Sequence, residues 1–171
     1  MKKATAIVLL SAGLSLASAS VLAENVASGF YVGLKTGAMI PEHRENNFNS
    51  LGFLAGYNFD YGLSAEYEQT HANPNIYTDG DKIEAHYKTQ TAYGVWRSGD
   101  VFYGKVKAGV SHIYEDAKIA GQGNRESQSG NRFSTGVGAG VRIGDHAMVE
   151  AEYTVLDQNM GYASIAAIGK F

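Results

Sequence analysis

The chain has 171 residues, with 14 Lys and Arg against 17 Asp and Glu, a formal net charge of −3, and no cysteine. An acidic chain of this kind is a poor partner for nucleic acid, which favours a basic stripe. The lack of cysteine excludes the small secreted scaffolds that disulfides hold together.

Residues 1–23 have the three parts of a secretory signal peptide. Met1 is followed by Lys2 and Lys3, an apolar run begins at Ile7, and small residues lead up to Ala23. A basic start, a short apolar core and small residues before the cut are typical of an export signal. The apolar run is too short, and too often interrupted by Ser and Gly, to span a membrane as a helix. We therefore predict cleavage after Ala23 and one domain over residues 24–171.

After residue 28 the chain alternates between apolar and polar side chains in eight successive stretches. A period of two is typical of β-strands with two unlike faces. The stretches are residues 30–38, 51–59, 63–68, 83–96, 102–110, 133–143, 149–155 and 163–171. Tight turns at residues 60–62, 97–100 and 144–146 alternate with longer polar connections. This order predicts an all-β fold, an eight-stranded antiparallel up-and-down transmembrane β-barrel with turns at one end and loops at the other.

The positions of glycine and of aromatic residues indicate which face of the barrel points outward. Glycines such as Gly33, Gly136 and Gly138 share a face with the charged residues, where they make room inside a narrow barrel. Rings on the apolar face gather toward both strand ends, as at two membrane interfaces. Those rings are Phe30, Phe59, Tyr93, Phe102 and Phe171 near the turns, and Tyr67, Tyr87 and Phe133 near the loops. The alternative is a soluble barrel of the lipocalin kind, in which the two faces are exchanged.

We predict that the charged residues of the inward face neutralise one another. A Lys or Arg that faced lipid near the midplane would cost about 2–4 kcal/mol. The predicted interior charges are Lys35, Glu66, Glu68, Glu84, Lys88, Lys105, Lys107, Arg142, Glu150 and Glu152. We interpret them as structural ion pairs, and we predict no catalytic, cofactor-binding or metal site.

Three segments resemble the small outer-membrane β-barrels of Gram-negative bacteria, the OmpA-type transmembrane domain, OmpX and the opacity-like porin family. They are GFYVGLKTG (29–37), LGFLAGYNFDYGLSAEYE (51–68) and GVGAGVRIGDHAMVEAEY (136–153), together with the closing Phe171. The resemblance implies an integral protein of the cell outer membrane, with loops outside and both termini in the periplasm. It also implies contact with outer-membrane lipids and lipopolysaccharide, an extracellular ligand at the loops, and Phe171 as the end that the barrel-assembly machinery recognises.

The predicted function is a structural and surface-interaction role, with a packed lumen that does not conduct and no enzymatic activity. The alternatives are a lipid A-modifying enzyme and a small pore. Deacylases among such barrels pair a His with a Ser two residues later, and none of the five histidines has that neighbour. An acyl transferase would use loop residues, for which the candidates are His71, Asp79, Ser127 and Ser129.

Overall fold

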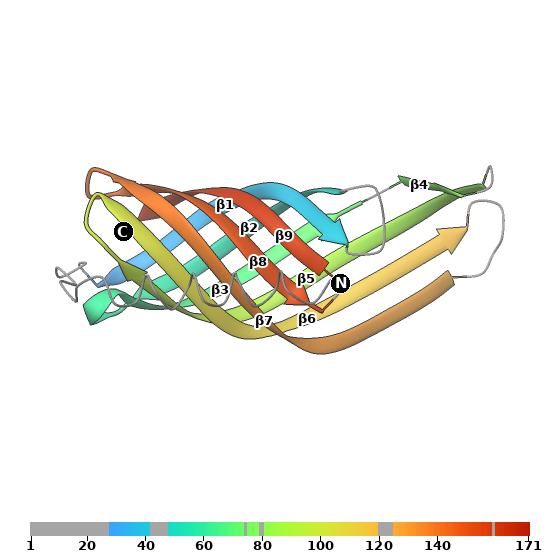
Figure 1. Cartoon of the computed structure of the whole chain (residues 1–171), viewed down its shortest axis with the longest axis horizontal. Helices are drawn as coiled ribbons and strands as arrows, with labels where there is room; N and C mark the ends of the chain where they lie inside the picture. Colours follow the sequence, from blue (N-terminus) through green and yellow to red (C-terminus); the bar gives the residue numbers. More distant parts are fainter. Residues whose placement is uncertain (1–27, 42–47, 74, 79–80, 120–124, 159) are drawn as a thin grey trace, which may run out of the picture.

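The computed structural model describes residues 28–41, 48–73, 75–78, 81–119, 125–158 and 160–171 (Figure 1). Its strands are β1 (Gly29–Pro41), β2 (Phe48–Asn58), β3 (Leu63–Ala72), β4 (Asn75–Thr78), β5 (Asp81–Ser98), β6 (Phe102–Ile119), β7 (Arg125–Ile143), β8 (Ala147–Asp157) and β9 (Met160–Lys170). A short 3₁₀ turn, η1 (Asp60–Gly62), joins β2 to β3. Within the described ranges, no helix is long and apolar enough to cross a membrane. The predicted signal peptide lies outside these ranges.

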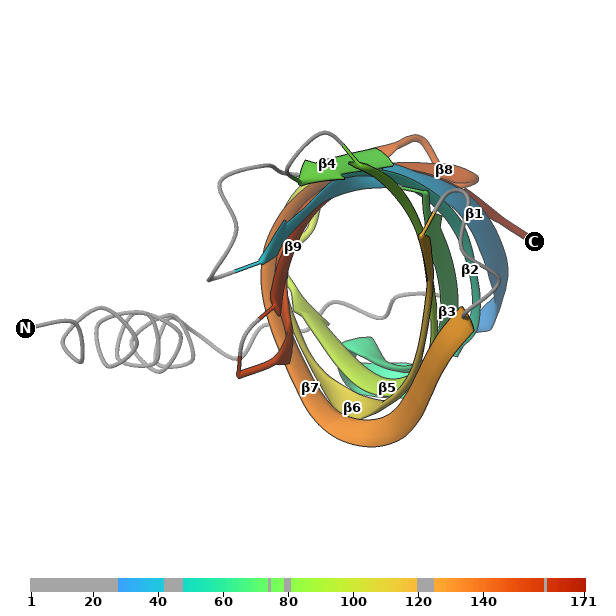
Figure 2. The ribbon, with the colours of Figure 1, turned by 90° about the vertical axis from the view of Figure 1, so that its right-hand side faces the viewer.

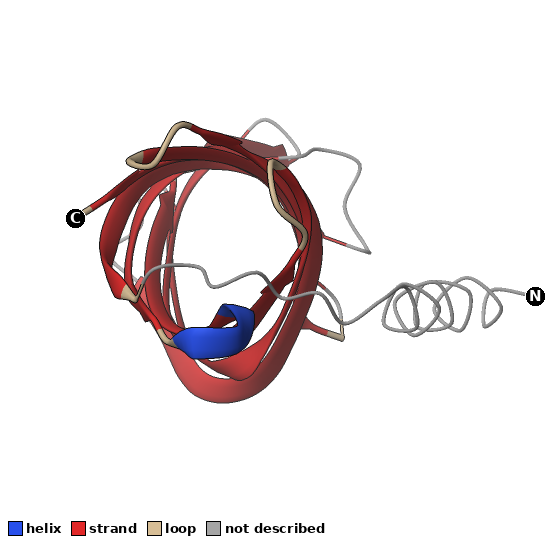
Figure 3. Ribbon diagram, turned by 90° about the vertical axis from the view of Figure 1, so that its left-hand side faces the viewer, coloured by secondary structure: helices blue, strands red, loops and turns tan. Residues whose placement is uncertain are grey.

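The strands form one antiparallel sheet that closes on itself. Neighbours follow the order β3-β2-β1-β9-β8-β7-β6-β5-β4, and β3 also pairs with β5. The closed ring is visible when the barrel is viewed from either end (Figures 2 and 3). The short β4 continues the line of β3 along the same edge of β5, because Ala72 lies opposite Tyr87 and Asn75 opposite Glu84. Because β3 and β4 share one place in the wall, the nine strands form a barrel eight strands around. The predicted eight-stranded antiparallel barrel is confirmed.

The two faces of the wall differ as a membrane barrel requires. Val137 and Tyr153 are 40% and 37% exposed on the outside, whereas Lys105 and Glu152 are 2% and 6% exposed on the inside. A soluble barrel would bury the first pair and expose the second. The lipocalin-like alternative is therefore wrong.

In β5 the faces are opposite to the prediction. Thr89, Thr91 and Tyr93 are buried inside the barrel, whereas Ala92 and Gly94 are exposed outside. Tyr93, which we expected to face lipid, shares a hydrogen bond of 2.8 Å with the inward Ser134 hydroxyl. Hydroxyl-bearing side chains fit the polar interior because partners for hydrogen bonds are present there.

The charged residues of β5 that were wrongly assigned to the interior lie near the loop end of the strand. Lys88 lies opposite His71, the last residue but one of β3, and His86 lies beyond it. At this height an outward charge is close to the edge of the membrane, where its cost falls toward zero. Charge alone therefore does not assign a residue to the interior near a strand end.

Three strands rise beyond the rest of the wall at the loop end. β5, β6 and β7 have 18, 18 and 19 residues, whereas β8 and β9 have 11 each. β8 pairs with β7 only from Thr135 onward, although β6 accompanies β7 as far as Arg125. The projecting part, which we call the extended sheet, comprises β4 and residues 81–86, 112–119 and 125–133 (right-hand end of Figure 1).

Candidate functional site

Acidic and basic side chains from five strands meet midway along the barrel interior. They alternate along each strand with outward residues, so pairs such as Glu66 and Glu68 share the inner face. In the part of the chain that the structure describes, four cations and four carboxylates form one buried set of ion pairs. This lumen network consists of Lys35, Glu66, Glu68, Arg97, Lys105, Lys107, Glu150 and Glu152.

Lys105 is the centre of the lumen network. Its Nζ atom lies 3.0 Å from Glu66 Oε1, 2.8 Å from Glu150 Oε2 and 2.7 Å from Glu152 Oε1. An ammonium group has three donors, so the three carboxylates saturate it. A buried charge is tolerated only with such compensation, since its loss of hydration costs several kcal/mol.

Arg97 links the network toward the turn end. Its Nε lies 2.7 Å from Glu150 and its Nη2 lies 2.9 Å from Glu66. Two tyrosines complete the hydrogen bonding: Tyr31 donates to Glu66 at 2.8 Å and Tyr103 donates to Glu150 at 2.9 Å. Arg97 was not predicted to be an interior charge, because residues 97–100 were assigned to a turn. The period of two through Tyr93 and Val95 extends to Arg97, but that side of the strand was predicted to face lipid.

Lys35 and Lys107 neutralise the carboxylates toward the loop end. Lys35 Nζ lies 2.7 Å from Glu68 and 3.2 Å from Glu152, and Lys107 pairs with the same two carboxylates. Glu66, Glu68 and Glu152 bring carboxylate oxygens within 4.8 Å of one another, a spacing that a metal ion could use. These oxygens already accept hydrogen bonds from lysine ammonium groups, so the arrangement has the chemistry of ion pairing.

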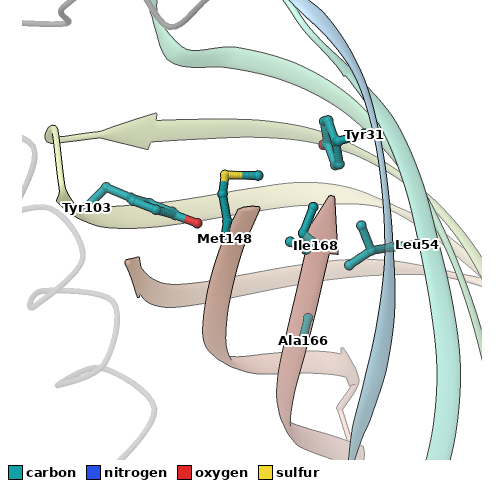
Figure 4. Packing of buried hydrophobic residues seen from close by; sticks show 6 residues of the cluster. All are labelled: Tyr31, Leu54, Tyr103, Met148, Ala166 and Ile168. Carbon is teal, nitrogen blue, oxygen red and sulfur yellow. The ribbon is translucent and has the colours of Figure 1, made fainter. Parts of the chain in front are cut away.

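Apolar clusters lie on both sides of the lumen network. The turn-end cluster contains Tyr31, Leu54, Tyr103, Met148, Ala166 and Ile168 (Figure 4). The loop-end cluster contains Met39, Ala72, Ile113, Leu156 and Tyr162. Toward the loops the interior also holds buried hydroxyl groups, such as those of Thr89, Thr91 and Ser134.

Three predicted interior charges lie outside the lumen network. Lys88 is half-buried on the outer face, between His71 and Tyr114 in the sheet, so its assignment to the interior is corrected. Arg142 lies at the turn end, with its guanidinium 4.5 Å from the centre of the Tyr103 ring. Glu84 lies in β5, where its backbone is opposite Asn75 of β4 and Lys118 of β6, but its side chain lies outside what the structure describes.

Phe171 follows β9 at the turn end of the barrel. Its backbone N–H donates to the Phe30 carbonyl at 2.9 Å, and its side chain is 81% exposed. An exposed ring at this position is available to lipid or to another protein. Recognition of Phe171 by the barrel-assembly machinery stays a prediction.

The residues considered for acyl transfer do not form a site among the described side chains. β5 and β6 separate His71 on β3 from Ser127 and Ser129 on β7. His71 instead shares a hydrogen bond of 2.7 Å with the Gln69 amide. Asp79 lies outside the described residues.

Several solved structures with a similar fold are bacterial surface or outer-membrane barrels. Neisserial surface protein A matches with a TM-score of 0.64 at 14% identity, over 84% of this chain and 98% of that chain. The N-terminal barrel of Pseudomonas aeruginosa OprF matches with a TM-score of 0.63 at 11% identity, over 85% of this chain and all of that one (100%). Ail of Yersinia pestis, solved with the heparin analogue sucrose octasulfate, matches with a TM-score of 0.58 at 14% identity, over 84% and 96%. Identities this low show a shared fold and nothing finer.

At the level of sequence, one family matches almost the entire chain. A search of curated proteins finds no match. The model described as outer membrane protein beta-barrel domain matches residues 9–166. The chain therefore belongs to the outer-membrane protein β-barrel domain family.

Proposed function

We propose that this protein is a non-conducting barrel that acts at the cell surface, with the extended sheet outside the cell and the short turns in the periplasm. The observation that carries the proposal is the extended sheet itself. A barrel that served only to cross the membrane would need strands of about 9–11 residues, and β5, β6 and β7 are far longer. The extra length is a surface for contacts.

The extended sheet offers two kinds of contact. Outward side chains such as Ser127, Ser129 and Asn131 are exposed and polar. The edge of β7 before Thr135 has no pairing with β8, so its backbone N–H and C=O groups can accept an added strand. Ail, a barrel of the same fold, was solved with a sulfated sugar, which supports a role in contacts with molecules outside the cell.

Single-cysteine labelling tests the orientation. The chain has no cysteine, so Ser127→Cys in the extended sheet and Asp145→Cys in a short turn each introduce one thiol. On intact cells we expect a membrane-impermeant maleimide to label the first variant only. The second should react only after the outer membrane has been permeabilised, and the reverse pattern would overturn the proposal.

The lumen network and its flanking clusters support the absence of conductance. Steady ion flow needs a continuous hydrated path with sites that bind ions weakly. Here ion pairs occupy the middle of the barrel, and one apolar cluster lies in the interior toward each end.

We expect purified, folded protein in planar lipid bilayers to show no unitary conductance steps, while a large porin reconstituted in the same way conducts. Recordings at both polarities check this expectation. Reproducible steps that scale with the amount of folded protein would favour the small-pore alternative.

A further inference from the structure

Two cations at the turn end of the barrel interior lie outside the lumen network. Arg142 is the last residue but one of β7, and Lys170 is the last residue of β9. Alternate residues of β9 as far as Ile168 are buried, so Lys170 continues the inward face of that strand. Among the described residues, neither cation forms an ion pair with a carboxylate. Because the lumen network balances its own charges, these two positive charges are a surplus at the turn end.

The guanidinium of Arg142 is held in position by contacts that leave one of its edges unused. Its Nη1 donates to the Gly99 carbonyl at 2.6 Å and also to the Asp100 carbonyl. Its central carbon lies 4.5 Å from the centre of the Tyr103 ring. The Nε and Nη2 atoms are buried and have no hydrogen-bond partner among the described residues. These two donors lie side by side and match two oxygens of one carboxylate or phosphate.

Arg97 uses the same edge of its guanidinium for carboxylates in the same barrel. Its Nε contacts Glu150 at 2.7 Å and its Nη2 contacts Glu66 at 2.9 Å. Arg142 presents the same two donors, but no acidic side chain of the described residues meets them. A third unpartnered donor at the turn end is Nδ2 of the buried Asn58, the last residue of β2. Donors without acceptors favour a ligand that only accepts hydrogen bonds.

Lys170 places a second positive charge near Arg142. The charges of Arg142 and Asp145 both act on the Lys170 ammonium. Asp145 is exposed in the turn between β7 and β8, where water screens its attraction. Two cations at one end of a narrow interior repel each other, and an anion that contacts both would remove that repulsion.

We propose that Arg142 and Lys170 bind a small soluble oxyanion of the phosphate class inside the turn end of the barrel. The Nε and Nη2 atoms of Arg142 would donate to two of its oxygens, and the Lys170 ammonium to a third. Both residues are half-buried near strand ends, so a small ion can enter from the turn end as the flexible side chain of Met148, opposite Arg142, shifts. The site goes beyond the proposed function and does not depend on which end of the barrel faces the periplasm.

Proton–nitrogen NMR of the folded barrel in a sugar-based detergent tests the site, with inorganic phosphate as the probe. Phosphate replaces chloride at constant ionic strength. We expect a saturable shift of the Arg142 Nε–H resonance, which is identified by its loss in Arg142→Gln. The Arg97 Nε–H is an internal control that should not move, because Glu150 already accepts its hydrogen bond. An Arg142 resonance that does not respond to phosphate overturns the site.

Two further comparisons test the part of Lys170. We expect Lys170→Gln to weaken phosphate binding about tenfold, the effect of losing one charge-assisted hydrogen bond. The matched control is Arg132→Gln, which removes a cation that pairs with Asp157 toward the loops and should leave the affinity unchanged. Acetate, with a single charge and two oxygens, should bind more weakly than phosphate. An unchanged affinity in Lys170→Gln, or acetate binding as tight as that of phosphate, overturns the two-cation site.

Discussion

Replacing Lys105 with methionine should lower the free energy of unfolding by about 3–5 kcal/mol, the cost of removing one partner from a buried ion pair. Methionine has a similar length, so little cavity forms and the effect reports the lost charge. The lumen network would be left with four carboxylates and three cations. Arg97 still contacts Glu66 and Glu150, but Glu152 loses its 2.7 Å contact with the Lys105 ammonium.

Urea unfolding in lipid vesicles, followed by the heat-modifiable shift on a gel, measures this loss. Lys88→Met is the matched control, because the same change on the outer face should stay within about 0.5 kcal/mol. Adding Glu152→Gln to Lys105→Met removes the surplus negative charge and should restore part of the stability. If Lys105→Met unfolds at the wild-type urea concentration, the lumen network does not stabilise the barrel.

Replacing Gly56 with alanine should destabilise the barrel by about 1–3 kcal/mol, the usual cost of overpacking. A Cβ atom at Gly56 would overlap the Tyr31 ring. That ring cannot move freely, because its hydroxyl donates to Glu66 at 2.8 Å and the Arg97 guanidinium lies 5.1 Å from its centre. The clash would therefore propagate into the lumen network.

Gly104→Ala is the control for Gly56→Ala, since no atom lies within 4 Å of the Cβ that it would add. The same urea titration should show little change for this variant. Equal loss in both variants would mean that the cost comes from strand glycines in general and not from the ring of Tyr31.

Alternation alone predicted the barrel and the orientation of seven of its strand stretches, because the face of a strand is a local property of period two. It failed in β5, where the strand continues past the membrane and the outward His86 and Lys88 resemble interior charges. Tyr93 was misplaced with them. Near a strand end, the environment of a side chain depends on where the neighbouring strands end. The local sequence of one strand does not contain that information.

The partners within the lumen network could not be predicted either. Lys35 meets Glu152, and Arg97 meets Glu150, because the register and tilt of several strands bring them to the same height. Sequence indicated which side chains point inward but not which strands face one another across the interior. Arg97 was missed for a simpler reason, namely that β5 continues to Ser98 before the chain turns at Gly99, whose φ is 120°.

The pairing of β1 with β9 constrains how the protein folds and inserts into the membrane. These strands lie at opposite ends of the described chain, yet Tyr31 is opposite Lys170 and Pro41 is opposite Met160. Until they join, both are open edges whose backbone groups cannot be satisfied in hydrocarbon. Contacts so distant in sequence form slowly. We therefore expect the chain to enter the bilayer only as closure proceeds, so that a molecule arrested before β9 docks would remain vulnerable to proteolysis and aggregation.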